Sequence, residues 1–263
     1  MKNRLILASL LIVLIIGNTL FAEDIFKVKI KYWDSGLGGK IKSDTALTAG
    51  TDLDLTKDLN LDKNAYVPSL ELKLKFGSNK IIGSYWKAAY NGKQTLTSAI
   101  NYNGATYNIN ATIKSKLGLQ TTSIIYERAL APEFITKAFP SLGELELGLL
   151  VGIENLSFDS SVTSALSSKK ENGSAPVPVI GALFQVGILN KVKVELGALG
   201  FNATISGISA KYTDIYAEVN STLIPYVPLG VGYKMNTLSL KDSGNFNTNI
   251  DLSGLYFFSS WEF

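Results

Sequence analysis

Strict alternation between apolar and polar residues recurs along this chain. The segments 26–32, 70–76, 144–154 and 191–201 each place most of their apolar side chains on one parity and their Lys and Glu residues on the other. A period of two predicts β-strands whose two faces meet different surroundings. The same pattern, followed through the whole chain, predicts strands near 25–35, 69–77, 80–91, 106–128, 143–159, 176–188, 191–206, 208–223, 229–240 and 246–263.

The lengths of the connections between strands distinguish a membrane barrel from a soluble β-sandwich, because the strands of a sandwich would show the same alternation of apolar and polar residues. Outer-membrane barrels have an even number of strands, short turns at one rim and long loops at the other. The predicted fold class is therefore all-β, a closed antiparallel transmembrane β-barrel of about ten strands, with eight or twelve as alternatives. The short turns are expected at 77–80, 189–191 and 224–228, and the longer loops at 36–67, 91–105, 160–175 and 241–245.

The first residues carry a different pattern. Lys2 and Arg4 precede an apolar stretch at 5–16, and Ala22 stands before the acidic Glu23. This order is typical of a secretory signal peptide, and the stretch is shorter than the roughly 20 residues of a spanning helix. We expect a signal peptide at 1–22, cleaved after Ala22, and a single barrel domain at 23–263.

The composition of the chain argues against several classes of function. Without Lys2 and Arg4 the formal net charge falls from +3 to +1, so no nucleic-acid partner is expected. The chain has no cysteine and no histidine, and therefore lacks a thiolate nucleophile, the commonest general base and the commonest metal ligand. We expect no enzymatic activity, no cofactor and no metal.

The last strand resembles the C-terminal signature of outer-membrane proteins. Leu255, Phe257, Trp261 and the final Phe263 share one parity, as in the strand that the assembly machinery of such proteins reads. Phe257, Trp261 and Phe263 would then form the assembly signal. The resemblance implies location in the bacterial outer membrane, contact with its lipid and lipopolysaccharide, and insertion by the barrel assembly machinery.

Three further segments, 50–63, 144–159 and 175–188, resemble a group of poorly characterised small outer-membrane barrels of Gram-negative bacteria. The group offers no catalytic or binding residues to transfer to this chain. Asn60 stands where a Gly is expected, so the turn of that loop differs here. Known outer-membrane enzymes resemble one another in using a histidine base, which this chain lacks.

Charged residues on the inward parity are the candidate lining of the lumen. Basic residues dominate the early strands and acidic residues dominate the later ones, so one wall is mainly basic and the other mainly acidic. The candidate pore-lining residues are Lys27, Lys29, Lys31, Lys73, Lys75, Glu144, Glu146, Glu154, Lys193, Glu195, Asp214 and Glu218. The same interpretation places Glu71, Lys87, Lys114, Lys116, Lys234 and Glu262 inside.

Two hypotheses follow for this lumen. In the first, ion pairs and side chains fill it, as side chains fill barrels of about eight strands. In the second, it is a narrow polar pathway for ions or a small solute. A third, minor hypothesis is a lateral gap admitting a hydrophobic ligand, because Pro176 and Pro178 would loosen strand pairing.

The first long loop is rich in aspartate. A solvated or lid-forming loop is the expectation, since charge-rich segments are usually exposed. A low-affinity calcium site is the alternative, although the order of ligands in an EF-hand is absent. The aspartates concerned are Asp44, Asp52, Asp54, Asp58 and Asp62.

These observations lead to two hypotheses of function. The first is a non-enzymatic outer-membrane barrel that forms a narrow channel for ions or small solutes. The alternative is a closed structural or surface-interaction barrel whose loops 36–67 and 160–175 contact an external partner. No motif in the sequence identifies that partner.

Overall fold

The computed structural model describes residues 25–130, 142–188, 192–205, 208–221, 228–242 and 246–263. The expected signal peptide at 1–22 lies outside these ranges. Among the residues that the structure describes, no helix has the length and apolarity to span a membrane.

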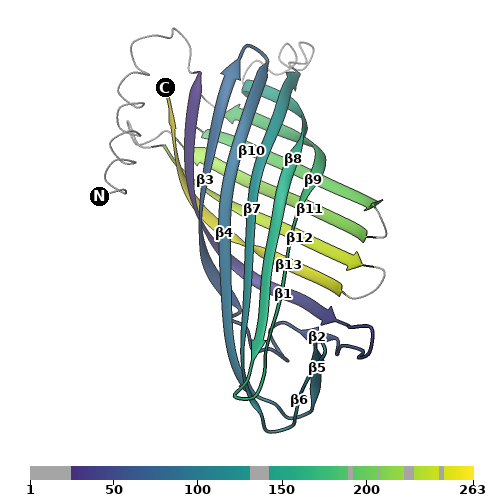
Figure 1. Cartoon of the computed structure of the whole chain (residues 1–263). Helices are drawn as coiled ribbons and strands as arrows, with labels where there is room; N and C mark the ends of the chain where they lie inside the picture. Colours follow the sequence, from purple (N-terminus) through teal and green to yellow (C-terminus); the bar gives the residue numbers. More distant parts are fainter. Residues whose placement is uncertain (1–24, 131–141, 189–191, 206–207, 222–227, 243–245) are drawn as a thin grey trace, which may run out of the picture.

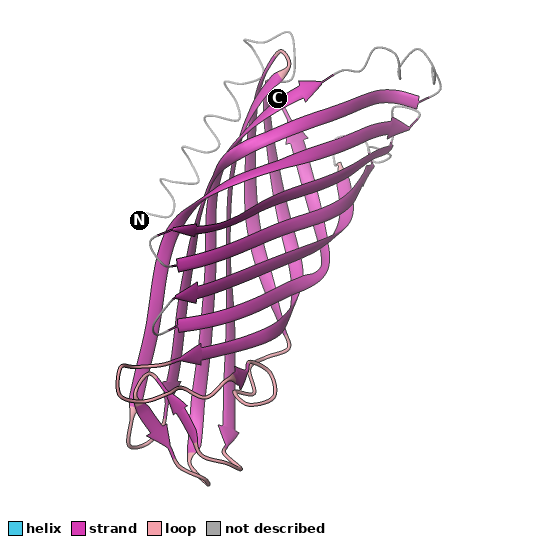
Figure 2. Ribbon diagram, turned by 90° about the vertical axis from the view of Figure 1, so that its right-hand side faces the viewer, coloured by secondary structure: helices cyan, strands magenta, loops and turns pink. Residues whose placement is uncertain are grey.

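Ten long antiparallel strands form one closed barrel in the described part of the chain, as predicted (Figures 1 and 2). Each strand pairs with its neighbours in chain order, and the last pairs with the first to complete the ring. The strands are β1 (Phe26–Ser43), β3 (Asn64–Phe76), β4 (Asn79–Thr95), β7 (Thr112–Leu130), β8 (Leu142–Thr163), β9 (Ser168–Ile188), β10 (Val192–Ile205), β11 (Ile208–Ser221), β12 (Leu229–Asp242) and β13 (Phe246–Glu262).

Three short strands lie at the rim opposite the C-terminus (Figure 1). β2 (Leu53–Asp54) pairs with the end of β1, while β5 (Ile100–Tyr102) and β6 (Ala105–Tyr107) form a separate hairpin. We call this rim the outer rim, because long connections mark the external side of outer-membrane barrels and short turns mark the periplasmic side.

Several strands extend further toward the outer rim than expected. β1 continues to Ser43, and β8 and β9 continue through the expected loop 160–175, leaving only the turn 164–167 between them. The expectation of a long loop at 160–175 was therefore wrong. The polar Ser, Asn and Lys residues there still pair across the hairpin, because a strand outside the membrane can present a polar face to water.

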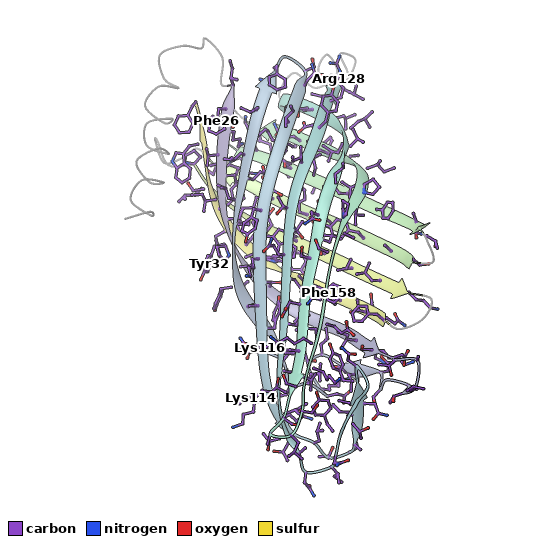
Figure 3. The ribbon with its side chains drawn as sticks, viewed as in Figure 1. Phe26, Tyr32, Lys114, Lys116, Arg128 and Phe158 are labelled. Carbon is purple, nitrogen blue, oxygen red and sulfur yellow. The ribbon has the colours of Figure 1, made fainter. Side chains whose placement is uncertain are left out.

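A belt of apolar side chains surrounds the barrel on the half nearer the C-terminus, and we call it the apolar belt. Figure 3 shows Phe26 and Tyr32 pointing outward from this half. At the outer edge of the belt, Tyr32 stacks on Tyr66 with ring centroids 5.6 Å apart. The belt includes Ile30, Leu70, Leu72, Leu74, Ile81, Tyr85, Ile124, Tyr126, Leu149, Val151, Ile153, Ile180, Phe184, Leu196, Ile215, Val219, Val231, Tyr233, Met235, Leu255 and Phe257, all exposed.

Beyond the belt the polarity of the two faces is reversed. On β7, Ile113 and Leu117 are buried inside the barrel, whereas Lys114 and Lys116 point outward (Figure 3). Lys87 on β4 is also exposed, on the outward parity of Tyr85. The prediction that Lys87, Lys114 and Lys116 face the lumen was wrong, because the strand keeps one parity throughout while its surroundings change from lipid to water.

Pairing between β9 and β10 ends at Ile180 and Gly200. Pro176 and Pro178 lie beyond that point and pair only toward β8, opposite Asn155 and Ile153. This position fits the lack of a backbone N–H in proline, because the side toward β10 requires no ladder hydrogen bond there.

Candidate functional site

The half of the lumen inside the apolar belt contains a network of buried ion pairs. Lys29, 2 % exposed, places its Nζ 2.5 Å from Glu218 Oε1 and 3.7 Å from Glu71 Oε1. Lys31 pairs with Glu71 at 2.8 Å, and the hydroxyl of Tyr256 donates to Glu218 Oε2 at 2.9 Å. These contacts connect β1 with β3, β11 and β13 across the lumen, so side chains inside the barrel hold four of its strands together.

A second group of ion pairs lies closer to the periplasmic rim. Lys80 Nζ lies 2.8 Å from Glu127 Oε1 and also contacts Glu146 Oε1, and Lys73 Nζ lies 3.6 Å from Glu127 Oε2. Lys27 pairs with Glu262 at 2.8 Å where β1 meets β13. Every one of these lysines has a carboxylate partner within 4 Å, which is the arrangement that makes burial of charge tolerable.

The remaining candidate lining residues differ in their surroundings. Glu195 is buried and accepts a hydrogen bond of 2.8 Å from the Tyr216 hydroxyl. Lys193 is half-buried and makes a contact of its own, whereas Lys75 is exposed where β3 reaches the rim. Glu144 lies on β8, but its side chain is outside the described part of the structure.

The sequence interpretation missed two buried members of the network, Lys80 and Glu127. Glu127 follows Ile125 on the inward parity of β7, and Lys80 lies directly opposite Glu127 on β4. The available signal for Glu127 was that it shares the parity of Ser123, opposite that of Ile124 and Tyr126. Lys80 was harder to assign because it follows immediately after a turn.

A small cavity lies at mid-height in the lumen, with a volume of about 90 Å³. Lys234 Nζ lies 2.8 Å from Asp214 Oδ2 and sits over the rings of Trp33 and Trp86, 5.4 and 5.9 Å from their centroids. Glu154, 3 % exposed, also lines this cavity. Glu154 Oε2 and Asp214 Oδ1 have no hydrogen-bond partner within the described protein. The volume exceeds the roughly 10–15 Å³ that one water molecule needs, so water has room to solvate these oxygens.

An apolar plug fills the outer end of the lumen. We use this name for Leu53, Leu55, Leu59 and Leu61 from the segment 44–63, each at most 3 % exposed. They join one apolar cluster with barrel-wall side chains and with the β5–β6 hairpin. The cluster also contains Trp33, Leu37, Ile41, Trp86, Tyr90, Leu96, Ile100, Tyr102, Tyr107, Ile113, Leu117, Leu119, Val162, Ile250 and Leu252.

Hydrogen bonds fix the plug and the hairpin to the wall. The N–H of Leu55 donates to Gly39 O on β1 at 3.1 Å, and within the plug the N–H of Leu61 donates to Leu55 O at 3.0 Å. From the hairpin, the Tyr102 hydroxyl donates to Ser160 Oγ at 3.0 Å and the Tyr107 hydroxyl donates to Val162 O at 2.8 Å. The buried tyrosines therefore have their polar atoms satisfied, as buried polar groups require.

The turn of the plug segment packs directly on β4. Asn60 has a φ of 47°, a left-handed conformation that Asn tolerates better than most residues. Its side-chain amide donates to Lys93 O at 2.9 Å. A Cβ on Gly92 would lie 2.5 Å from the backbone oxygens of Leu59 and Asn60. Glycine at 92 therefore permits the segment to approach the strand.

The aspartates of this segment cap its turns. Asp54 Oδ1 accepts the N–H groups of Thr56 at 3.0 Å and Lys57 at 2.9 Å, and Asp58 Oδ2 accepts the N–H of Asp54 at 2.8 Å. Burial raises the pKa of Asp54, but the hydrogen bonds outweigh it and the net pKa is lowered. No group of three or more potential metal-ligating side chains occurs among the residues that the structure describes.

Asp44 caps the first turn after β1. Its Oδ1 accepts the N–H of Gly50 at 2.6 Å, and Lys42 Nζ lies 3.0 Å from Oδ2. The hydrogen bond from Gly50, with a smaller contribution from Lys42, lowers the pKa of Asp44 below its ordinary value. The carboxylate therefore stabilises this turn in its ionised form.

Comparisons with known proteins place the fold. No protein-family model matches the chain, and no curated protein matches it. The outer membrane protease OmpT of Escherichia coli has a similar structure, with a TM-score of 0.51 and 12 % identity over 93 % of this chain and 98 % of OmpT. Weaker matches include Ail of Yersinia pestis (TM-score 0.37, 11 % identity, 89 % and 99 % covered) and Neisserial surface protein A (TM-score 0.34, 11 % identity, 89 % and 96 % covered).

At these identities the likeness concerns the fold alone. The ring of ten paired strands leaves no open sheet edge, and the exposed apolar belt requires lipid around it. Together with the similarity to OmpT, these features show that the chain has the fold of an outer-membrane β-barrel.

Proposed function

We propose that this protein is a closed, non-enzymatic outer-membrane barrel that acts through its external head. The external head is the part of the barrel beyond the apolar belt, together with the segment 44–63 and the β5–β6 hairpin. The single observation that carries this proposal is the apolar plug, which occupies the outer end of the lumen.

The energetics of the plug argue against a conducting pathway. Full burial of a leucine side chain contributes roughly 1.5–3 kcal/mol, so expelling four would cost roughly 6–12 kcal/mol as an upper estimate. A free-energy difference of about 5.5 kcal/mol between the open and the plugged barrel already favours the plugged barrel by a factor of about 10⁴. The ion-paired half below the plug is a second obstruction, because its lysines and glutamates contact one another instead of lining an open bore.

The chemistry of the described lumen supports a non-catalytic role. The carboxylates Glu154 and Asp214 lie below the plug, around a cavity of about 90 Å³ that is too small for a peptide or lipid substrate. The chain contains neither histidine nor cysteine to assist them. OmpT is described as a protease, but the similarity to it carries no catalytic residue to this chain.

Conductance of the refolded protein in a planar lipid bilayer tests the proposal. We expect no current steps from protein shown to be folded by heat-dependent mobility on gels, with a general porin as the positive control. Discrete, salt-dependent steps whose ion selectivity changes with Lys31→Glu would contradict the closed lumen and favour the channel hypothesis. Lys31 suits this test because it lines the cavity and is less buried than Lys29.

A second measurement tests the role of the external head. Proteolysis of intact cells should cleave at the exposed tips, where Leu47 and Leu166 are each 97 % exposed, and should leave the strands intact. Complete resistance in intact cells, with cleavage after lysis, would mean that these tips face the periplasm.

A further inference from the structure

The cavity at mid-height in the lumen is lined by six charged side chains, and five of them belong to ion pairs. The ion pairs are Lys31 with Glu71 at 2.8 Å, Lys73 with Glu127 at 3.6 Å and Lys234 with Asp214 at 2.8 Å. The sixth charged side chain is Glu154 on β8, which is buried and has no ion-pair partner within the described residues. A buried carboxylate without a partner is costly, so this position needs a compensating charge.

The ammonium of Lys234 does not supply that charge. It acts electrostatically on Glu154, but its Nζ contacts Asp214 Oδ2 and lies over the rings of Trp33 and Trp86. The carboxylate of Asp214 in turn repels that of Glu154. With both carboxylates ionised, the two acidic groups and the one ammonium carry a net charge of −1 in a buried site.

Hydrogen bonds satisfy only part of each carboxylate. Asn236 Nδ2 donates to the Tyr212 hydroxyl at 2.8 Å, which directs the hydroxyl proton toward the acidic groups. The hydroxyl donates to Asp214 Oδ2 at 3.3 Å and also interacts with Glu154. Glu154 Oε2 and Asp214 Oδ1 remain without a partner in the described protein, although both side chains are more than nine-tenths buried.

The charge and the number of free oxygens indicate the kind of ligand. Calcium takes about six to eight oxygen ligands, which two carboxylate oxygens beside an ammonium do not provide. A single monovalent cation balances the net charge of −1 without adding a surplus of positive charge next to Lys234. The cavity volume of about 90 Å³ also leaves room for water molecules to complete the coordination of such an ion.

We propose that the cavity binds one alkali cation, sodium or potassium, between Glu154 Oε2 and Asp214 Oδ1. The ion offsets the buried negative charge and connects β8 with β11, which the pair of Asp214 with Lys234 already connects to β12. This inference goes beyond the closed-barrel proposal and does not depend on it, because these oxygens would bind a cation in a plugged or an open lumen.

The test follows urea unfolding of the protein, refolded in detergent micelles, over a series of sodium or potassium chloride concentrations. N-methyl-D-glucamine chloride keeps the ionic strength constant, and its cation is too large for the cavity. A ligand that binds only the folded state stabilises that state by mass action. If one ion is released on unfolding, the unfolding equilibrium constant should fall about tenfold for each tenfold rise in cation concentration above the Kd. An equilibrium constant that does not respond to either alkali cation would overturn the proposal.

Two variants assign the effect to the cavity. Glu154→Gln keeps the size of the side chain but removes its charge, so the dependence on alkali cation should disappear. The matched control is Glu262→Gln, which removes a carboxylate that pairs with Lys27 near the periplasmic rim and does not line the cavity. The control should keep the tenfold dependence. The same dependence in Glu154→Gln as in the wild type would mean that the ion binds elsewhere.

Tryptophan emission of the folded protein provides a direct measurement of binding. Trp33 and Trp86 line the cavity and contact the ammonium of Lys234, so an ion bound beside Asp214 should change their emission. The change should saturate at the cation concentrations that stabilise the protein and should be absent in Glu154→Gln. A gain in stability without any change in emission would contradict a site in this cavity.

Discussion

The membrane half and the external head of this barrel use opposite polarity on the same strands. In the belt, Ile124 of β7 is 67 % exposed while its neighbour Ser123 is buried. In the head, Lys116 of the same strand is exposed while Leu117 is buried. Parity along a strand is continuous, so the reversal of polarity reflects the surroundings of each half. The comparison teaches that the polarity of an alternating strand does not by itself identify its inner face.

The two halves also differ in how their interiors are held together. The membrane half relies on buried ion pairs, whose attraction must first offset the loss of hydration. The external head relies on apolar burial, which is non-directional and proportional to area. We therefore expect the ionic half to respond sharply to the loss of a single partner. The plug should respond in proportion to the volume that is removed.

The largest effect is expected from Glu218→Gln. It would leave the buried ammonium of Lys29 with only Glu71, 3.7 Å away. Breaking one side of a buried pair costs about 3–5 kcal/mol, so the free energy of unfolding, measured by tryptophan fluorescence in urea, should fall by that amount. The double variant Lys29→Met with Glu218→Leu should recover most of the loss. A single-variant effect below about 1 kcal/mol would mean that the pair is not desolvated.

A smaller and more local effect is expected from Leu55→Ala, since Leu55 is fully buried in the plug. A leucine-to-alanine change in a core costs about 2–5 kcal/mol. Here the loss should appear as faster hydrogen exchange in 53–61, because the plug can open without the barrel. Leu47→Ala is the control, with an expected effect within about 0.5 kcal/mol. Unchanged exchange in Leu55→Ala would show that the plug does not depend on apolar packing.

The cavity offers a pair of variants with different expected outcomes. Among the described residues, Lys234 forms an ion pair with a single carboxylate, that of Asp214. The Asp214→Asn variant should therefore lower the free energy of unfolding by about 1–3 kcal/mol. Glu154→Gln neutralises a buried carboxylate with an unpartnered oxygen and should leave the free energy of unfolding unchanged or raise it. Equal losses in urea unfolding would show that the ionised Glu154 contributes as much to stability as the Asp214 carboxylate does.

The smallest effect is a pH response in the external head. The pKa of Asp44 is lower in the folded protein than its ordinary value of 3.8. Its contribution to stability is therefore complete above the unfolded pKa and is lost as the pH falls through the folded one. Protease cleavage in 44–50 should rise as the pH falls below the ordinary pKa of 3.8, and Asp44→Asn should abolish this change. A transition of the same size in Asp44→Asn would assign it to another group.

Much of the fold could be predicted from the sequence, because lipid and lumen impose opposite demands on adjacent residues. The alternation in 26–32 and 70–76 was sufficient to predict strands there, and ten long strands form the barrel in the described part of the chain. Lys114 and Lys116 were assigned to the wrong face because the lumen was assumed to be polar along its whole length. The inward neighbours Ile113 and Leu117 carried the opposite signal.

The plug was overlooked for a related reason. In 50–63 the aspartates drew attention, whereas Leu53, Leu55, Leu59 and Leu61, all at odd positions, are the residues that the fold buries. The contact of Lys29 with Glu218 could not be predicted. Its partners are 189 residues apart, and which side chains meet across a lumen depends on strand tilt and register.

The seam between β1 and β13 has a consequence for the order of folding. It joins residues as far apart as Lys27 and Glu262, so its loop-closure entropy is the greatest of any strand pair in the barrel. The hairpins from β3 onward need only local contacts and can form first. Lys29 meets Glu218 only after the ring has closed, so an incomplete sheet would carry bare charges on the face meant for the lumen. Closure should therefore be the rate-limiting and most cooperative step of insertion.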